Sequence, residues 1–240
     1  MEKVDLDQTF GNQQVDSQER EKLIRRVFNK VAPRYDLMND AMSFGIHRLW
    51  KDKLVKLASP QDNQIIVDLA GGTGDVAIKM APSCQHVFIA DPSMAMIQEG
   101  RERHNISSLA STGENLALAD QSVDTLTIAF GIRNMTHMEK GLKEIYRVLK
   151  PGGRVLCLEF SKPHKLLKPF YDLYSTHIIP RLGARIAQQP EAYTYLIESI
   201  RRFPDQNEMK SIMENTGFTD VSYKNLSFGI ACIHIASKKA

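Results

Sequence analysis

Short apolar runs alternate with segments of helical periodicity through the middle of the chain, and this alternation constrains the fold more than any other feature. The runs are IIVDLA, VFIAD, VDTLTIAF and GRVLCLEF, which begin at Ile65, Val87, Val123 and Gly153. Apolar strands separated by helices are typical of a parallel sheet with helices on both of its faces. We therefore predict a doubly wound α/β fold.

Further helices and strands surround this central pattern. Apolar side chains at helical spacing among charged ones predict amphipathic helices, and glycine and proline mark their ends. In two runs near the C-terminus apolar and polar residues alternate, which predicts that these runs form the last two strands. The predicted helices cover 17–30, 46–57, 138–149 and 206–215, and the predicted closing strands cover 218–226 and 228–237.

Two segments differ from this pattern. Residues 1–16 are polar and acidic, so we expect a flexible arm there. Residues 161–205 are too long for a connection between sheet elements and contain aromatic residues at helical spacing, which predicts a helical insertion. A length of 240 residues suits a single domain over 1–240.

Composition limits the class of protein without naming it. A formal charge of +3 and a pI near 8.7 suit an acidic surface but require none. The three cysteines lie far apart, which indicates a reducing compartment and no structural zinc. Since no run of about 18 apolar residues occurs, nothing in the sequence predicts a transmembrane helix. We expect a cytoplasmic protein without a metal.

The strongest motif is DLAGGTGD, from Asp68 to Asp75, where the first apolar run turns into a helix. Glycines there, including Gly72 and Gly74, let the backbone turn tightly and approach a ligand closely. Asp91 ends the second apolar run, where a carboxylate can hold both hydroxyls of an adenosine ribose. These two elements predict a nucleoside site.

Acidic residues around the glycines distinguish between nucleoside cofactors. Carboxylates at Asp68 and Asp75 would repel a pyrophosphate but attract the sulfonium and ammonium groups of S-adenosylmethionine. Ala77 replaces the third glycine of the dinucleotide fingerprint, which tolerates it, and no Gly-Lys-Ser/Thr follows as a P-loop requires. Asp68 could instead cap the turn, and Asp91 could cap a helix. We predict S-adenosylmethionine as the cofactor.

Four longer segments carry a resemblance to a known family. They are VFNKVAPRYDLMNDAMSFGIHRLWK, DLAGGTGD, IAFGIRNMTHMEKGLKEIYRVLKPGGRVLCLEFSKP and YLIESIRRFPDQNEMKSIMENTGF. With them the chain resembles the ubiquinone/menaquinone biosynthesis C-methyltransferases from about Val27 to its end. This implies a Rossmann-like class I methyltransferase fold with a mostly parallel seven-stranded sheet, an antiparallel C-terminal strand, N-terminal helices and a helical insertion.

The resemblance also implies cofactor contacts. By position they fall on Thr73, Asp91 and the pair Thr112 and Gly113. Many relatives have Asn or Asp followed by Ala in place of that pair, and Ser in place of Ala129. The cofactor residues expected from the glycine turn and the resemblance together are Asp68, Gly72, Thr73, Gly74, Asp91, Thr112, Gly113 and Ala129.

The implied reaction is methylation of a ring carbon of a polyprenylated quinol. Arg133, after the fourth apolar run, could stabilise the developing oxyanion with Asn134 orienting it, or it could be a structural ion-pair partner. Residues 17–60 should form a helical lid over the cofactor. Within it Tyr35 and His47 are catalytic candidates, and His47 could accept a proton near neutral pH or merely hydrogen-bond within the lid.

The substrate also suggests where the enzyme works. A polyprenyl tail is too apolar to leave a bilayer readily, so we expect peripheral association with the inner face of the membrane, and a quinone-biosynthesis complex is a further expected partner. Aromatic residues in 170–196 could line a tail groove, although such residues are more often core. We expect no nucleic-acid partner. The alternatives are a methyltransferase of another small molecule or RNA, and a non-catalytic subunit.

Overall fold

The computed structural model describes residues 8–10, 13–32, 39–40, 43–164 and 190–240. Its centre is a seven-stranded sheet with the strand order β5-β4-β3-β6-β7-β9-β8. β9 runs antiparallel to both of its neighbours, and the other pairings are parallel. The strands are β3 (Ile65–Leu69), β4 (His86–Asp91), β5 (Ser107–Ala110), β6 (Val123–Ala129), β7 (Leu149–Phe160), β8 (Thr219–Leu226) and β9 (Ala231–Ser237). The predicted α/β fold is confirmed.

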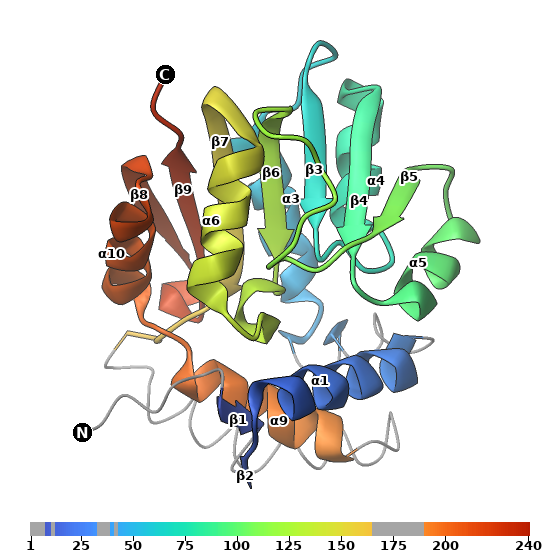
Figure 1. Cartoon of the computed structure of the whole chain (residues 1–240), viewed down its shortest axis with the longest axis vertical. Helices are drawn as coiled ribbons and strands as arrows, with labels where there is room; N and C mark the ends of the chain where they lie inside the picture. The colour runs from blue at the N-terminus through green and yellow to red at the C-terminus, as the bar shows by residue number, and fades with distance from the viewer. Residues whose placement is uncertain (1–7, 11–12, 33–38, 41–42, 165–189) are drawn as a thin grey trace.

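Helices cover both faces of the sheet (Figure 1). α6 (Met138–Val148) and α10 (Gln206–Thr216) lie over one face, and α3 (Ile46–Ala58) and α4 (Asp75–Met80) lie over the other. Successive strand residues point to opposite faces. Accordingly Ile66 packs with α3 and α4, whereas Val67 packs with α6 and α10. The remaining short elements are α5 (Met94–Arg101) and the 3₁₀ turns Ala81–Ser83, Ile132–Asn134 and Ser227–Gly229.

The N-terminal segment crosses the sheet end to which the parallel strands point. There α1 (Ser17–Val31) lies beside α9 (Pro190–Arg202) (Figure 1). β1 (Thr9–Phe10) pairs with β2 (Gln13–Gln14). Within the arm that we expected over 1–16, the Phe10 ring stacks on Tyr195 at 4.6 Å between centroids.

Helix and strand boundaries follow the sequence closely. The glycine at 217 caps α10 in a left-handed conformation, as a helix end requires. β7 begins at Leu149, which pairs with Val123 of β6, four residues before the start at Gly153 that the apolar run suggested. Of the predicted insertion, α9 is described and 165–189 lie outside the described residues. None of the described helices has the length and apolarity that crossing a membrane demands.

Candidate active site

The chain changes direction across the sheet next to β3. β4 and β5 lie on one side of β3, and β6 and β7 on the other. Ligands of open α/β sheets bind beyond the carboxyl ends of the strands at such a switch point. A cavity of about 370 Å³ lies here, which is within the range of small-molecule sites. Its walls come from the ends of β3, β4 and β6, the segment after β5, and α1.

The glycine turn closes one side of this cavity. Ala70, Gly72 and Gly74 have positive φ angles of 51°, 57° and 91°. This conformation favours glycine, so Ala70 is strained there. The Ala70 N–H donates to Ala90 O at 2.7 Å, which ties the turn to β4. A β-carbon on Gly74 would lie 2.3 Å from His104 Nε2, so only glycine fits at this position.

Asp91 lies in the cavity wall with its carboxylate held by backbone. Gly72 N–H donates to Oδ2 at 2.9 Å and Ser93 N–H donates to Oδ1 at 2.8 Å. A carboxylate has about four lone-pair sites, so two of them are left for hydroxyl donors. Burial raises the pKa of Asp91 to about 6. The cap of α5 is the side chain of Ser93, so the carboxylate of Asp91 is not needed for that role.

Asp68 lies beneath the glycine turn rather than in the cavity wall. Its Oδ1 accepts a hydrogen bond from Thr127 Oγ1 at 2.7 Å. Its buried Oδ2 has no hydrogen-bond partner in the part of the chain that the structure describes. Burial raises the pKa of Asp68 to about 7. A cation in the nearby cavity would favour the ionised form of this carboxyl.

These features fit S-adenosylmethionine. Asp91 offers acceptors for two ribose hydroxyls, and the unpartnered oxygen of Asp68 supplies negative charge for a cationic group. Thr112 and Gly113 form a further wall of the cavity, next to Met135. A β-carbon on Gly113 would lie 2.3 Å from the Met135 Cε, so glycine gives that side chain its room.

Arg133 lies behind the cavity in a buried ion pair. Its Nη1 is 2.6 Å from Glu159 Oε1 and also donates to Phe130 O at 2.8 Å. The guanidinium is 5.5 Å from the centroid of the Phe160 ring. Asn134 does line the cavity, and its Oδ1 accepts a hydrogen bond from the Tyr195 hydroxyl at 2.9 Å. Of these two neighbouring residues, Asn134 thus lies in the wall of the cavity and Arg133 lies behind it.

His47 is buried at the start of α3, outside the described wall of the cavity. Its Nδ1 is 2.8 Å from Ser43 Oγ. Burial, followed by the positive charge of Lys51, lowers the pKa of His47 to about 4. His47 is therefore neutral at pH 7, and its role in catalysis stays a prediction. Tyr35 lies outside the described residues. Trp50 is buried against Phe130.

The predicted site residues fall into two groups. Those found in the described wall of the cavity are Gly72, Asp91, Thr112, Gly113 and Asn134. Those that the structure describes but places outside that wall are His47, Asp68, Thr73, Gly74, Ala129 and Arg133. Ala129 is followed by Phe130, which does line the cavity and has a positive φ of 58°.

α1 belongs to the segment 17–60 that we expected to cover the cofactor, but the sequence analysis did not identify which of its residues would line the site. One face of this helix lines the cavity with side chains at helical spacing: Ser17, Gln18, Glu21, Ile24, Arg25 and Phe28. The buried Arg20 fixes the helix to the loop after β6. It donates to Met135 O at 3.0 Å and to Arg133 O at 3.2 Å. The amphipathic spacing identified the helix, but the pattern does not tell which surface its inner face covers.

Comparison with known proteins gives the family of the chain. The model of the ubiE/COQ5 methyltransferase family matches residues 14–238. The ubiquinone/menaquinone biosynthesis C-methyltransferase UbiE of Rubrivivax gelatinosus is 57% identical over 241 residues, covering 100% of this chain and 96% of the relative.

Solved structures share the fold at low sequence identity. An S-adenosylmethionine-dependent methyltransferase of Thermotoga maritima has a TM-score of 0.68 at 23% identity, covering 90% of this chain and 100% of its own. A phosphoethanolamine N-methyltransferase of Haemonchus contortus, solved with S-adenosyl-L-methionine, has a TM-score of 0.60 at 17% identity, covering 80% of this chain and 52% of its own. From the match over nearly its whole length, the chain belongs to the ubiE/COQ5 methyltransferase family.

Proposed function

We propose that this protein transfers the methyl group of S-adenosylmethionine to a ring carbon of a polyprenylated quinol, in ubiquinone biosynthesis, menaquinone biosynthesis or both. The observation that carries the proposal is one cavity that combines Gly72 and Asp91 with the apolar side chains of Phe28, Phe130 and Met135. Such a cavity can hold a nucleoside next to an apolar ring. The name of the Rubrivivax gelatinosus relative supports the same reaction.

Some residues of the cavity would bind the cofactor, and others would stabilise the phenolate of the substrate. Asp91 and the Gly72 turn bind the nucleoside end, with Thr112 and Gly113 beside it. When bound, the cofactor supplies an electrophilic methyl group on a sulfonium. A quinol carbon attacks only after a ring hydroxyl loses its proton, so the site must favour the phenolate. Asn134 would orient that oxygen, and the charge of Arg133 behind it would stabilise it.

The reaction is tested with purified protein, methyl-labelled adenosylmethionine, and short-tailed demethylated benzoquinol and naphthoquinol in parallel. We expect label in a ring carbon of at least one product, and the product shows which ring is accepted. Protein treated identically without either quinol gives the background. Cofactor binding without transfer to either ring would contradict the proposal and favour another acceptor, RNA included, or a non-catalytic subunit.

We also infer that the protein binds the cytoplasmic face of a membrane through an exposed apolar surface. Phe44, Leu49 and Phe228 are 72%, 66% and 77% exposed. Trp50 Nε1 donates to Ser227 Oγ at 3.0 Å, which joins α3 to the turn before β9, and Leu49 and Phe228 are the sequence neighbours of these two residues. Lys162 and His164 lie next to this turn, since His164 N–H donates to Phe228 O at 2.9 Å. Apolar side chains beside basic ones fit an anionic lipid surface.

Flotation with phosphatidylglycerol-containing vesicles tests the surface. We expect the double substitution Leu49→Ser and Phe228→Ser to weaken binding by about tenfold or more, since burying each apolar side chain contributes roughly 1.5–3 kcal/mol. Ile78→Ser changes another exposed apolar residue, on α4, and should leave binding unchanged. Equal binding by the double variant and the unchanged protein would contradict membrane docking here and favour a protein partner in a quinone-biosynthesis complex.

A further inference from the structure

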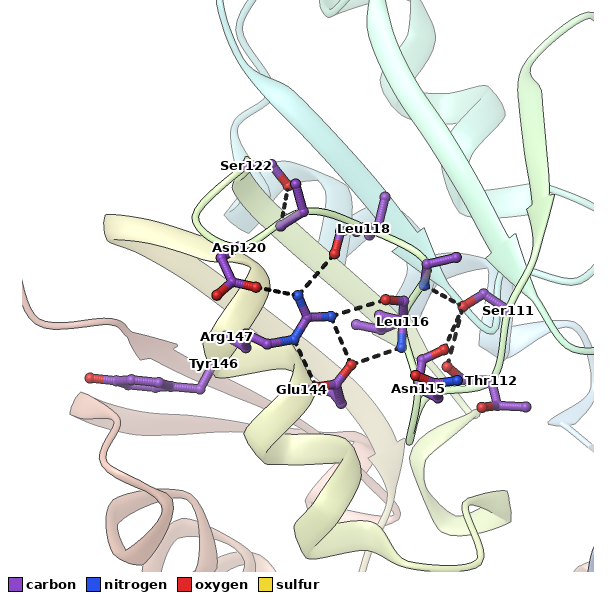
Figure 2. Close-up of polar contacts among 12 residues, drawn as sticks. Ser111, Thr112, Asn115, Leu116, Leu118, Asp120, Ser122, Glu144, Tyr146 and Arg147 are labelled. Carbon is purple, nitrogen blue, oxygen red and sulfur yellow. Dashed lines mark hydrogen bonds and ion pairs between the residues drawn. The ribbon is translucent and has the colours of Figure 1, made fainter.

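The segment between β5 and β6 supplies one wall of the cavity but forms no helix or long strand of its own. Thr112, Gly113, Glu114 and Asn115 line the cavity from this segment. A loop of this kind depends on side chains for its shape. Figure 2 shows that two side chains of α6, Glu144 and Arg147, reach this loop.

Arg147 of α6 makes three hydrogen bonds to the loop and two to Glu144 of its own helix. Its Nη1 donates to Leu118 O at 2.9 Å and to Asp120 Oδ1 at 2.6 Å. Its Nη2 donates to Leu116 O at 2.9 Å and to Glu144 Oε2 at 2.8 Å. Its Nε donates to Glu144 Oε1 at 2.8 Å. Arginine has five N–H donors in a planar fork, so each has an acceptor here.

Glu144 extends the same network to the backbone N–H of the loop. Its Oε2 accepts a hydrogen bond from Leu116 N–H at 2.9 Å. Leu116 is thus held at both of its backbone polar groups, by Glu144 and by Arg147 (Figure 2). The hydroxyl of Ser111 donates to Asn115 O at 3.1 Å and accepts from Ala117 N–H at 3.0 Å. Residues 112–115 therefore lie in a turn whose two ends are fixed.

We propose that Arg147, acting with Glu144, is a positioning residue for the cofactor. Arg147 lies outside the described wall of the cavity, so it acts through the loop that it binds. Its role is to hold Thr112 and Gly113 at the distance that the nucleobase end of adenosylmethionine requires. The inference rests on the proposed assignment of these two residues to the cofactor.

The test is the substitution Arg147→Lys, which keeps the positive charge but replaces the planar fork with a single ammonium. We expect the KM and Kd for adenosylmethionine to rise about tenfold, as the loss of one or two net hydrogen bonds implies. The kcat at saturating cofactor and the KM for the quinol should stay within about twofold. Amide hydrogen exchange of residues 112–117 should become faster and return toward the unchanged protein's rate when cofactor is added.

A matched control is Arg103→Lys in the turn after α5, where the arginine pairs with Glu99 of α5 at 2.8 Å on the surface. This variant should leave both KM values unchanged. If Arg147→Lys does not fold, Glu144→Gln provides a milder change, and a rise of about threefold in the cofactor KM alone is expected. An unchanged cofactor KM, or an equal rise in the KM of both substrates, would overturn the positioning role. Methyl transfer to the quinol by the unchanged protein tests the proposed function separately from the role of Arg147.

Discussion

Replacing Asp91 with alanine should raise the Kd for adenosylmethionine by about 100-fold or more. The carboxylate would lose two hydrogen bonds to ribose hydroxyls, and hydrogen bonds to charged groups contribute about 1.5–3 kcal/mol each. The Gly72 and Ser93 N–H groups would also lose their acceptor, so the glycine turn would lose one of its two ties to the end of β4. Isothermal titration calorimetry measures the change.

The Asp91→Asn variant tests whether the negative charge of this side chain is required, because it keeps the size of the side chain. Asp91→Asn offers one oxygen and one NH₂ group, so a donor must face either Gly72 N–H or Ser93 N–H. We therefore expect a loss close to that of the alanine variant. Asp62→Asn changes a carboxylate that accepts from Gln85 N–H at the far end of the sheet and should not affect binding. A Kd for Asp91→Ala within twofold of the unchanged protein would remove Asp91 from the site.

The same carboxyl predicts how cofactor affinity depends on pH. Burial raises the pKa of Asp91 to about 6 in the free protein, and hydroxyl donors favour its ionised form. Affinity should thus be full above pH 6 and fall as the pH decreases below it, by up to about tenfold per unit. Asp68, whose pKa burial raises to about 7, is the nearby group that could add to this dependence. The Asp68→Asn variant should still lose affinity for the cofactor as the pH falls below 6.

Replacing Arg133 with methionine should reduce both stability and turnover. Glu159 would be left buried without its partner, and removing one member of a buried ion pair costs roughly 3–5 kcal/mol. Loss of a positive charge behind the developing oxyanion should lower kcat by about 100-fold or more. Urea unfolding and single-turnover transfer report the two effects separately.

The double substitution Arg133→Met and Glu159→Gln distinguishes the two roles. Since it leaves no buried charge, most of the lost stability should return. If the charge of Arg133 serves the reaction, kcat should remain low while the Kd for adenosylmethionine changes only a few-fold. Recovery of kcat together with stability would make Arg133 a structural residue alone. Lys150→Met with Asp124→Asn removes a more exposed pair and should have a small effect on both.

Local patterns in the sequence predicted most of the fold. The helix from Ser17 and the strands from Ile65 and Val123 follow apolar periodicities that depend only on neighbouring residues. Gly72 and Gly74 predicted a tight turn because glycine marks backbone with positive φ. Ala70 and Phe130 adopt the same region without glycine, and their positions could not be inferred from residue type.

Contacts between distant residues limited what could be predicted about the site. Arg133, in the 3₁₀ turn after β6, pairs with Glu159 of β7, 26 residues away in the chain. Arg20 binds the carbonyl of Met135, 115 residues away. Both depend on side-chain geometry that leaves no periodic signal. For the same reason the sequence could suggest an oxyanion role for Arg133 but not that its guanidinium lies behind Asn134.

A crystal structure with S-adenosylhomocysteine and a short-tailed quinol tests the central claim most directly. The account predicts ribose hydroxyls within hydrogen-bond distance of Asp91, the nucleobase against Thr112 and Gly113, and the quinol ring beside Asn134 under α1. Density for either molecule outside this cavity, or a ribose that does not contact Asp91, would contradict it.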